Sequence, residues 1–228
     1  MIIAIDGPSG AGKSTLGKML AKKLKLLYLD TGAMYRAVAV AAGRAGVPLD
    51  DARRLAAIAE SAKIDLVGEP DAMKVMLDGT DVSVDIRTLE VAQAASVVST
   101  ISAVRRIMVD HQRQIGMSAP GGCVLEGRDI GSVVFPNADI KFFLTATPEA
   151  RARRRHTEDQ SKGRISTYEQ TLAEINERDE RDVSRADSPL TIADDAIVID
   201  TSELDLTEVF EQMLERIDGA TASVVSEV

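Results

Sequence analysis

Scarce residue types are informative here, because several classes of protein depend on residues that this chain barely contains. Among its 228 residues there is one cysteine, Cys123, and there are two histidines, His111 and His156. One cysteine cannot form an internal disulfide, and the histidines lack companion ligands at metal-binding spacing. The sequence therefore predicts neither a disulfide framework nor a structural zinc site, and it is typical of a reducing compartment.

Long apolar runs are also missing. No segment approaches the roughly 20 apolar residues that a membrane-spanning helix needs. The first residues lack the charged region and apolar segment of a secretory signal. We therefore expect a cytoplasmic protein with no membrane partner.

Positive charge is in deficit over the chain as a whole. The formal net charge is -9, whereas a surface that clamps a nucleic-acid backbone needs clustered lysine and arginine. We expect no nucleic-acid partner, and an anionic ligand must meet a local basic cluster. Apolar residues make up 45% and charged residues 28% of the chain, as in an ordinary globular protein of one or two domains.

A glycine-rich stretch near the N-terminus carries the strongest motif. It matches the phosphate-binding P-loop pattern G-x-x-x-x-G-K-[ST]. The apolar run 2–5 precedes it and the amphipathic segment 16–24 follows it, which is the strand–loop–helix context that the motif requires. The residues are Gly7, Pro8, Ser9, Gly10, Ala11, Gly12, Lys13, Ser14 and Thr15.

Each part of this loop has a chemical purpose. Backbone N–H groups and the positive end of the following helix bind phosphate oxygens. Lys13 reaches the outer phosphates, and the hydroxyl of Ser14 ligates Mg²⁺. The sequence therefore predicts a site for a nucleoside triphosphate with its magnesium ion.

Further apolar runs alternate with helical patterns, which predicts an α/β fold with a parallel sheet flanked by helices. The runs are residues 26–29, 122–126, 139–144 and 196–200, and the helices are expected at 49–63, 89–100, 103–117 and 206–217. Ser102 fits the N-cap of the helix at 103–117.

Polar residues follow two of these strands. Ligands of open α/β sheets gather at the carboxyl ends of strands, so Asp30, Thr31 and Arg36 are candidates, as are Arg128 and Asp129. Thr31 suits two roles equally, contact with a ligand and capping of the next helix.

Residues 64–86 depart from the alternating pattern. Short strand patterns surround the turn at 78–80, and Val82, Val84 and Ile86 occupy alternate positions after it. This predicts a small antiparallel unit, either covering a substrate or serving only as a decorative insertion.

Residues 148–185 are dense in arginine interleaved with acidic residues. Taken alone, they suit a solvated helix face with ion pairs such as Glu174–Arg178 and Glu177–Arg181. Beside a P-loop, we favour an arginine-rich lid with Gly163 as its hinge. The predicted organisation is a single domain over 1–218: a core of 1–63, 87–147 and 186–218, an insert at about 64–86, a lid at about 148–185 and a disordered tail at 219–228.

Three classes of P-loop protein compete. A GTPase normally carries a guanine-reading N-K-x-D stretch, which is absent, and an ATPase motor is usually longer. A small kinase needs only a P-loop, an acceptor pocket and lid arginines. A nucleoside monophosphate is already ionised and needs no general base, whereas a hydroxyl acceptor such as shikimate favours a nearby aspartate. Asp30 or Asp129 keeps that second acceptor open.

Four motifs together closely resemble bacterial cytidylate kinases. They are the P-loop, the run Asp30-Thr31-Gly32-Ala33-Met34-Tyr35-Arg36, the run Gly127-Arg128-Asp129-Ile130-Gly131, and the run Glu177-Arg178-Asp179-Glu180-Arg181-Asp182. They occur in the family's order, and the resemblance extends from residue 1 to about 217. The segment 64–86 is similar to the family's enlarged monophosphate-binding insert.

The resemblance implies a P-loop NTPase-type kinase that transfers the γ-phosphoryl group of ATP to CMP or dCMP with the assistance of Mg²⁺. The transfer would be direct and in line, without a general base. It would involve Lys13, Arg128, Arg178 and Arg181 as catalytic residues, with Ser14 as the metal ligand.

The resemblance also implies an acceptor site. Thr31, Arg105, Asp129 and Arg185 would surround cytosine, Arg36 and Arg128 would hold the phosphate, and Ser96, Arg178 and Asp182 would contact the sugar. An arginine–aspartate combination meets both the carbonyl acceptor and the amino donor of cytosine, which disfavours uracil. Arg154 and Arg155 are further lid candidates.

One departure from the family pattern stands beside the predicted phosphate site. Glu126 occupies a position where the family often has aspartate, so a water-mediated role toward Mg²⁺ and a plain strand-end role both stay open. The chain shows no long apolar seam beyond its expected core, and we expect a monomer.

Overall fold

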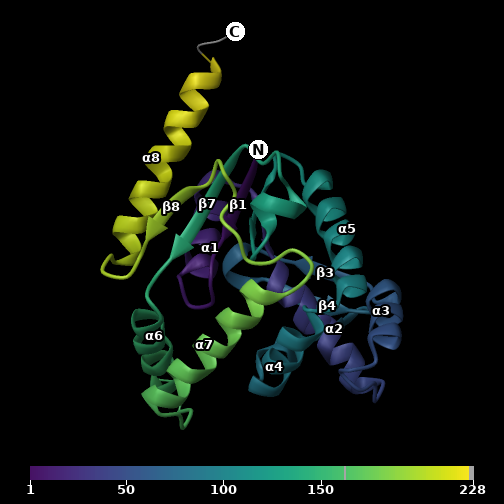
Figure 1. Ribbon diagram of the computed structural model, residues 1–228. Coiled ribbons are helices and arrows are strands. Elements are labelled where there is room, and N and C mark those ends of the chain that lie inside the picture. Colours follow the sequence, from purple (N-terminus) through teal and green to yellow (C-terminus); the bar gives the residue numbers. More distant parts are fainter. Residues whose placement is uncertain (162, 226–228) are drawn as a thin grey trace.

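A parallel sheet forms the centre of the computed structural model (Figure 1), which describes the backbone of residues 1–161 and 163–225 and the side chains of these ranges up to residue 220. Its strands are β1 (Ile2–Asp6), β2 (Leu27–Asp30), β6 (Cys123–Glu126), β7 (Ile140–Thr145) and β8 (Ile197–Asp200). They lie in the order β2-β6-β1-β7-β8, and every neighbouring pair is parallel. The predicted α/β fold is confirmed.

The helices are α1 (Lys13–Leu24), α2 (Thr31–Arg44), α3 (Ala52–Ser61), α4 (Leu89–Val98), α5 (Ser102–Ser118), α6 (Pro148–Ser161), α7 (Tyr168–Ser184) and α8 (Leu206–Val225). The helices α1 and α8 cover one face of this sheet, and α2 and α5 cover the other. Side chains of β1 alternate between two cores, because successive residues of a strand point to opposite faces. Ile3 and Ile5 pack with α1 and α8, and Ala4 packs with α2 and α5.

This topology brings separate polar segments together. The carboxyl ends of β1, β2 and β6 lie side by side, with Asp30 paired in register to Glu126 and Ile5 to Glu126 from the other side. The P-loop, the start of α2 and the loop after β6 therefore meet at one edge of the sheet, as expected for ligand sites in open α/β folds.

The insert is antiparallel as predicted, but its last strand is shorter. Its strands are β3 (Ile64–Val67), β4 (Lys74–Leu77) and β5 (Thr80–Asp81). The expected alternation through Ile86 is wrong, since Val84 is 81% exposed and Ile86 lies in a 3₁₀ turn. Asp81 ends the strand by accepting hydrogen bonds from the backbone and hydroxyl of Ser83, an Asx turn that competes with strand pairing.

Two predicted helix caps are also wrong. Asp30, not Thr31, caps α2, and its carboxylate accepts from the Ala33 N–H at 2.9 Å. Thr31 is the first helical residue, and its hydroxyl donates to the Glu126 carbonyl at the end of β6 at 2.7 Å. This hydroxyl therefore does not cap the helix. Ser102 likewise lies inside the first turn of α5, after Ile101, which packs against the core.

The arginine-rich segment folds as a helical hairpin of α6 and α7, which pack on one another (Figure 1). Thr167 begins α7 with a capping box completed by Gln170. Gly163 lies between the helices at φ 70° and reverses the chain there, so it is not placed to act as a hinge to the core. Of the two predicted helical ion pairs, Glu177–Arg181 forms at 3.2 Å, whereas Glu174 pairs with Arg155 at 3.1 Å.

The last helix is longer than the sequence pattern indicates. It was expected to end at Ile217, and it continues to Val225 because no proline follows to interrupt it. This stretch covers most of the predicted tail, whose residues 226–228 lie outside the described ranges. Within those ranges, no helix combines the length and apolarity that crossing a bilayer requires.

Candidate active site

Glycine geometry shapes the P-loop between β1 and α1. Gly7 has φ 141°, and a Cβ there would lie 2.0 Å from the Leu144 carbonyl oxygen on β7. Gly12 has φ 93° and occupies the N-cap of α1, so the helix begins at Lys13. Side chains rarely adopt such φ values, and only glycine allows this close approach. The loop consequently curls over the N-terminus of α1, the positive end of the helix dipole.

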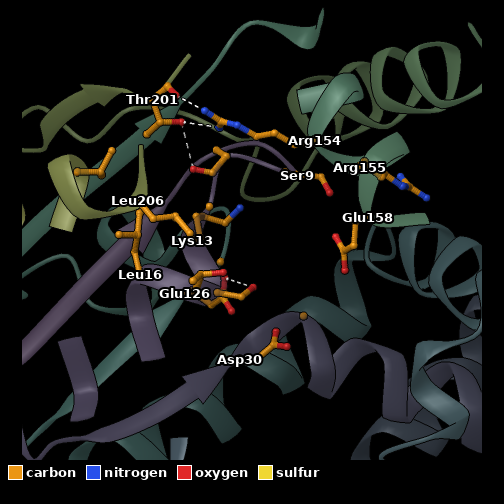
Figure 2. Close-up of a pocket in the computed structure, with 18 of the residues that line it drawn as sticks. Ser9, Lys13, Leu16, Asp30, Glu126, Arg154, Arg155, Glu158, Thr201 and Leu206 are labelled. Carbon is orange, nitrogen blue, oxygen red and sulfur yellow. Dashed lines mark hydrogen bonds between the residues drawn. The ribbon is translucent and has the colours of Figure 1, made fainter. Parts of the chain in front are cut away.

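A cleft of about 750 Å³ opens over this loop. In Figure 2, Leu16 and Leu206 lie on one side of Lys13, and Arg155 and Glu158 of α6 lie on the other. Arg154 of α6 closes one end by hydrogen bonds to Thr201, which follows β8. The cleft therefore has a wall from the α6–α7 hairpin, a wall from the β8–α8 junction and a floor from the P-loop.

Lys13 is buried on the floor of this cleft, with 6% of its surface exposed. Its amine donates to the Pro8 carbonyl at 2.7 Å. Burial, and then the nearby charge of Arg128, lower the pKa of Lys13 from 10.5 to about 7. A bound polyphosphate would bring negative charge close to this amine and would stabilise its protonated form.

Ser14 is part of a chain of oxygens. Its hydroxyl donates to one carboxylate oxygen of Glu126 at 2.9 Å, and the phenol of Tyr28 donates to the other. Burial, reinforced by Asp30, raises the pKa of Glu126. Among the described residues, no three or more histidine, cysteine or acidic side chains gather into a metal cage. Mg²⁺ commonly takes few protein oxygens beside phosphate and water, so Ser14 with Glu126 fits that ion.

A second cavity, of about 70 Å³, adjoins the cleft. Every residue that the family resemblance assigned to the acceptor lines it. These are Thr31, Arg36, Ser96, Arg105, Arg128, Asp129, Arg178, Asp182 and Arg185. They come from α2, α4, α5, the loop after β6 and α7 with its end, so only the tertiary fold brings them together.

One end of the second cavity carries a buried ion pair between Arg105 and Asp129. The Arg105 guanidinium also lies 5.6 Å from the ring centroid of Tyr35. Within the described residues, Nε of Arg105 and a terminal nitrogen of Arg185 are buried without a hydrogen-bond partner. Buried donors normally have partners, so these unsatisfied groups point to a polar ligand at this end.

The wall shared by the two cavities is lined by three guanidinium groups, those of Arg36, Arg128 and Arg178. Arg36 pairs with Asp30 at 2.7 Å, and Arg128 pairs with Asp182 at 2.7 Å. Burial, and then the Arg128 charge, lower the pKa of Arg178 to about 10, so Arg178 is still charged near neutral pH. A local basic cluster thus forms in a chain of net negative charge, as the sequence required.

Some predicted residues are not at the cavity surfaces. Gly7 and Pro8 are not among the lining residues, and they shape the loop from behind. Arg181 also lines neither cavity: it donates to the Ser96 hydroxyl at 2.9 Å and pairs with Glu177. Its geometry therefore places it one step away from any transferring group.

Other site residues were missed by the sequence reasoning. The β8–α8 wall is formed by Thr201, Leu204 and Leu206, where the sequence pattern indicates only a strand end followed by a helix. Polar residues at a strand end were a usable signal for Thr201, since the same rule had found Thr31. The sequence gives no indication that Arg151 and Asp6 matter. They differ from other charged residues in being buried, and a sequence does not show burial.

A comparison with protein families agrees with the geometry. The family model described as Cytidylate kinase matches residues 3–219. The chain belongs to the cytidylate kinase family. Curated relatives named cytidylate kinase include that of Geobacter sp. (strain M21), 47% identical over 93% of this chain and 91% of the relative. That of Mycobacterium leprae (strain Br4923) is 46% identical over 98% of both chains.

Solved structures are similar to this chain at the level of fold. A shikimate kinase from Bacteroides thetaiotaomicron has a TM-score of 0.50 at 13% identity, covering 97% of this chain and 98% of that one. An uncharacterized protein from Eubacterium ventriosum has a TM-score of 0.52 at 14% identity, covering 96% and 98%. At these identities the likeness concerns the fold alone, and it does not choose an acceptor.

Proposed function

We propose that this protein transfers the γ-phosphoryl group of ATP to the phosphate of CMP or dCMP, by direct in-line displacement without a general base. The observation that carries the proposal is the wall of three guanidinium groups shared by two cavities. One cavity contains a P-loop, and the other contains the residues expected to hold a nucleoside monophosphate. A phosphoryl group passing between them would meet Arg36, Arg128 and Arg178.

Charge stabilisation is the main work that these residues would do. Phosphoryl transfer needs the two oxygens in line and the charge of the transferring group neutralised, with little other chemistry from the protein. Lys13, on the floor of the larger cleft, would bind the outer phosphates of ATP. Arg128 and Arg178 would bind charge from the acceptor side, where it develops in the transition state.

Magnesium binding fits the oxygen donors around Ser14. A magnesium ion held there would neutralise part of the phosphate charge of ATP. Ser14 would hold it directly, and Glu126 would orient the Ser14 hydroxyl through the 2.9 Å hydrogen bond.

Cytosine recognition is proposed for Arg105, Asp129, Thr31 and Arg185. A guanidinium donates to the carbonyl oxygen of the base, and a carboxylate accepts from its amino group. Uracil has a carbonyl in place of that amino group, so its oxygen would face the Asp129 carboxylate. Differences in hydrogen-bonding groups of this kind discriminate strongly between substrates.

A hydroxyl acceptor such as shikimate is less well supported. It would need a free carboxylate as a base, yet Asp30 is paired with Arg36 and Asp129 is paired with Arg105. Burial alone would raise the pKa of Asp30, but the Arg36 charge and the Ala33 amide hold it below its ordinary value. A carboxylate with a low pKa is a weak proton acceptor.

The experiment that tests the proposal measures Mg²⁺-dependent ADP production from ATP with CMP, dCMP, UMP, AMP, GMP and shikimate supplied separately. We expect strong activity with CMP and dCMP alone. Activity that requires another acceptor would contradict the acceptor assignment and leave the P-loop assignment standing. We also propose a cytoplasmic monomer, for which light scattering should give a mass near 24.4 kDa.

A further inference from the structure

Two arginines from different lid helices hold the tip of the P-loop at Ser9. A terminal nitrogen of Arg151, on α6, donates to the Ser9 carbonyl at 3.1 Å. A terminal nitrogen of Arg178, on α7, donates to the Ser9 hydroxyl at 3.2 Å. Both oxygens of one loop residue are therefore engaged by the lid hairpin.

Arg151 is more deeply buried than a surface ion-pair partner would be, with 2% of its surface exposed. Its Nε donates to the Ala146 carbonyl at 2.9 Å, just after β7. Its two terminal nitrogens bind the two carboxylate oxygens of Asp179 at 3.1 and 2.5 Å. A Cβ on Gly10 would lie 3.3 Å from the Arg151 Cβ, so the loop also packs against this side chain.

The Arg151–Asp179 ion pair connects the P-loop to Arg178, which lines the wall shared by the two cavities. Asp179 precedes Asp182 and immediately follows Arg178 on α7. A fixed Asp179 therefore fixes the part of the helix from which Arg178 extends. Ser9, Arg151, Asp179 and the adjacent Arg178 form a closed set of contacts linking the P-loop, α6 and α7, which we call the Ser9 clamp.

We propose that Arg151 is a positioning residue: through the Ser9 clamp it holds the P-loop tip and Arg178 in the relative geometry that phosphoryl transfer requires. This inference deepens the proposed function and rests on it for its kinetic consequences. Arg151 lines neither cavity, and so it acts through Ser9 and Arg178 and does not contact the reacting atoms.

Only arginine can make this set of contacts. Its planar guanidinium presents donors in three directions, toward Ala146, Ser9 and Asp179. A lysine carries the same charge on a point-like ammonium group and cannot reproduce the two-pronged pairing together with the Nε contact. Arg151→Lys therefore keeps the positive charge and removes the simultaneous hydrogen bonds to Ala146, Ser9 and Asp179.

The matched control is Arg153→Lys. Arg153 lies on the same helix, is exposed, and is not among the residues that line the cavities. For Arg151→Lys, we expect kcat to fall by about tenfold to a hundredfold, because small misplacements of catalytic groups have effects of this size. We expect the Kd for CMP, measured by calorimetry, to change by less than about threefold, since most of the acceptor site lies on α2, α5 and the loop after β6.

Two kinetic results would overturn the proposal. One is a kcat for Arg151→Lys equal to that of Arg153→Lys. The other is a loss that appears in CMP binding and not in kcat. Asp179→Asn provides a second route if Arg151→Lys folds poorly, and it should reproduce the loss of kcat while the double variant loses little more than either single one.

Hydrogen exchange separates this inference from the proposed function. In the absence of any nucleotide, backbone amides at residues 9–12 should exchange faster in Arg151→Lys than in the wild type, and Arg153→Lys should match the wild type. Unchanged exchange would contradict the clamp even in an active kinase. Faster exchange in a protein without CMP-dependent activity would support the clamp and reject the acceptor assignment.

Discussion

Lys13 illustrates how burial alters a single functional group. Its amine is covered by the P-loop and lies near the positive charge of Arg128, and the two effects together lower its pKa to about 7. A nucleotide that brings negative charge to this amine should favour the charged form. Binding of the triphosphate should thus be coupled to protonation of Lys13.

The first prediction follows from that coupling. At about pH 8 the amine is mostly neutral in the empty site, so binding of ATP should take up about one proton, whereas at about pH 6 uptake through Lys13 should be close to zero. Calorimetry in buffers of different ionisation enthalpy measures this uptake. Lys13→Arg, whose guanidinium stays charged, should show none at either pH, and equal uptake in both proteins would contradict the role of Lys13.

Asp129 is the residue on which base selection depends. Its carboxylate is buried and paired with Arg105, so it is held in place before a ligand arrives. We predict that Asp129→Ala lowers kcat/KM for CMP by about a hundredfold or more and lowers that for UMP much less. Parallel assays of both substrates with the one variant provide an internal control, and an equal loss with both would mean that Asp129 does not recognise the base.

At the scale of elements, one irregular turn carries several site residues. The strand β6 is followed by Gly127, Arg128 and Asp129 and then by a π-helical turn at Ile130–Val134. Asp6, at the end of β1, accepts from the N–H groups of Ile130 and Gly131 at 2.8 and 2.7 Å. The turn is thus tied directly to the strand that leads into the P-loop.

We predict that Asp6→Asn destabilises this turn. The new amide group must direct its NH₂ toward one of the two backbone N–H groups, leaving a buried donor unpaired at a cost of about 1–3 kcal/mol in the free energy of unfolding. Denaturant unfolding measures this loss, and kcat should fall as well because Arg128 and Asp129 immediately precede the turn. Asp139→Asn, which replaces an exposed acceptor of the Ile2 N–H at the other end of β1, should have a smaller effect; equal effects would contradict the prediction.

At the scale of the whole molecule, the lid hairpin connects the two cavities. Arg154 and Arg155 of α6 line the larger one, and Arg178 of α7 lines both. We propose that the positive groups of this hairpin are drawn toward two bound nucleotides, and that its closure would exclude water from the transfer.

The corresponding prediction concerns residues 150–185. Their protection from hydrogen exchange should rise further when ATP and CMP analogues are both bound than when either is bound alone, because only the two together neutralise the shared arginine wall. The helix α3 at the far side of the insert serves as the comparison. Protection that is the same with one nucleotide as with two would contradict closure by this segment.

Local sequence patterns were sufficient to predict much of the fold and many of the candidate site residues of this protein. The P-loop, the parallel strands and the acceptor motifs could be predicted because apolar periodicity, glycine spacing and strand-end polarity are local properties of the chain. The family resemblance then named the residues that the second cavity brings together. Some predictions that were wrong, such as the cap at Thr31, concerned side chains whose partners lie far away in sequence, whereas the early end of β5 follows from a local hydrogen bond between Asp81 and Ser83.

Tertiary structure decided which charges are buried and what they contact. Arg151 and Arg153 are indistinguishable in sequence, yet one is enclosed by Asp179, Ser9 and Ala146 and the other is exposed. Glu126 likewise acquires its contacts with Ser14 and Tyr28 only because β2, β6 and the P-loop meet at one sheet edge. Sequence determined the elements and the chemistry available to them, and packing determined the neighbours, because a charged side chain depends on long-range contacts that no local pattern records.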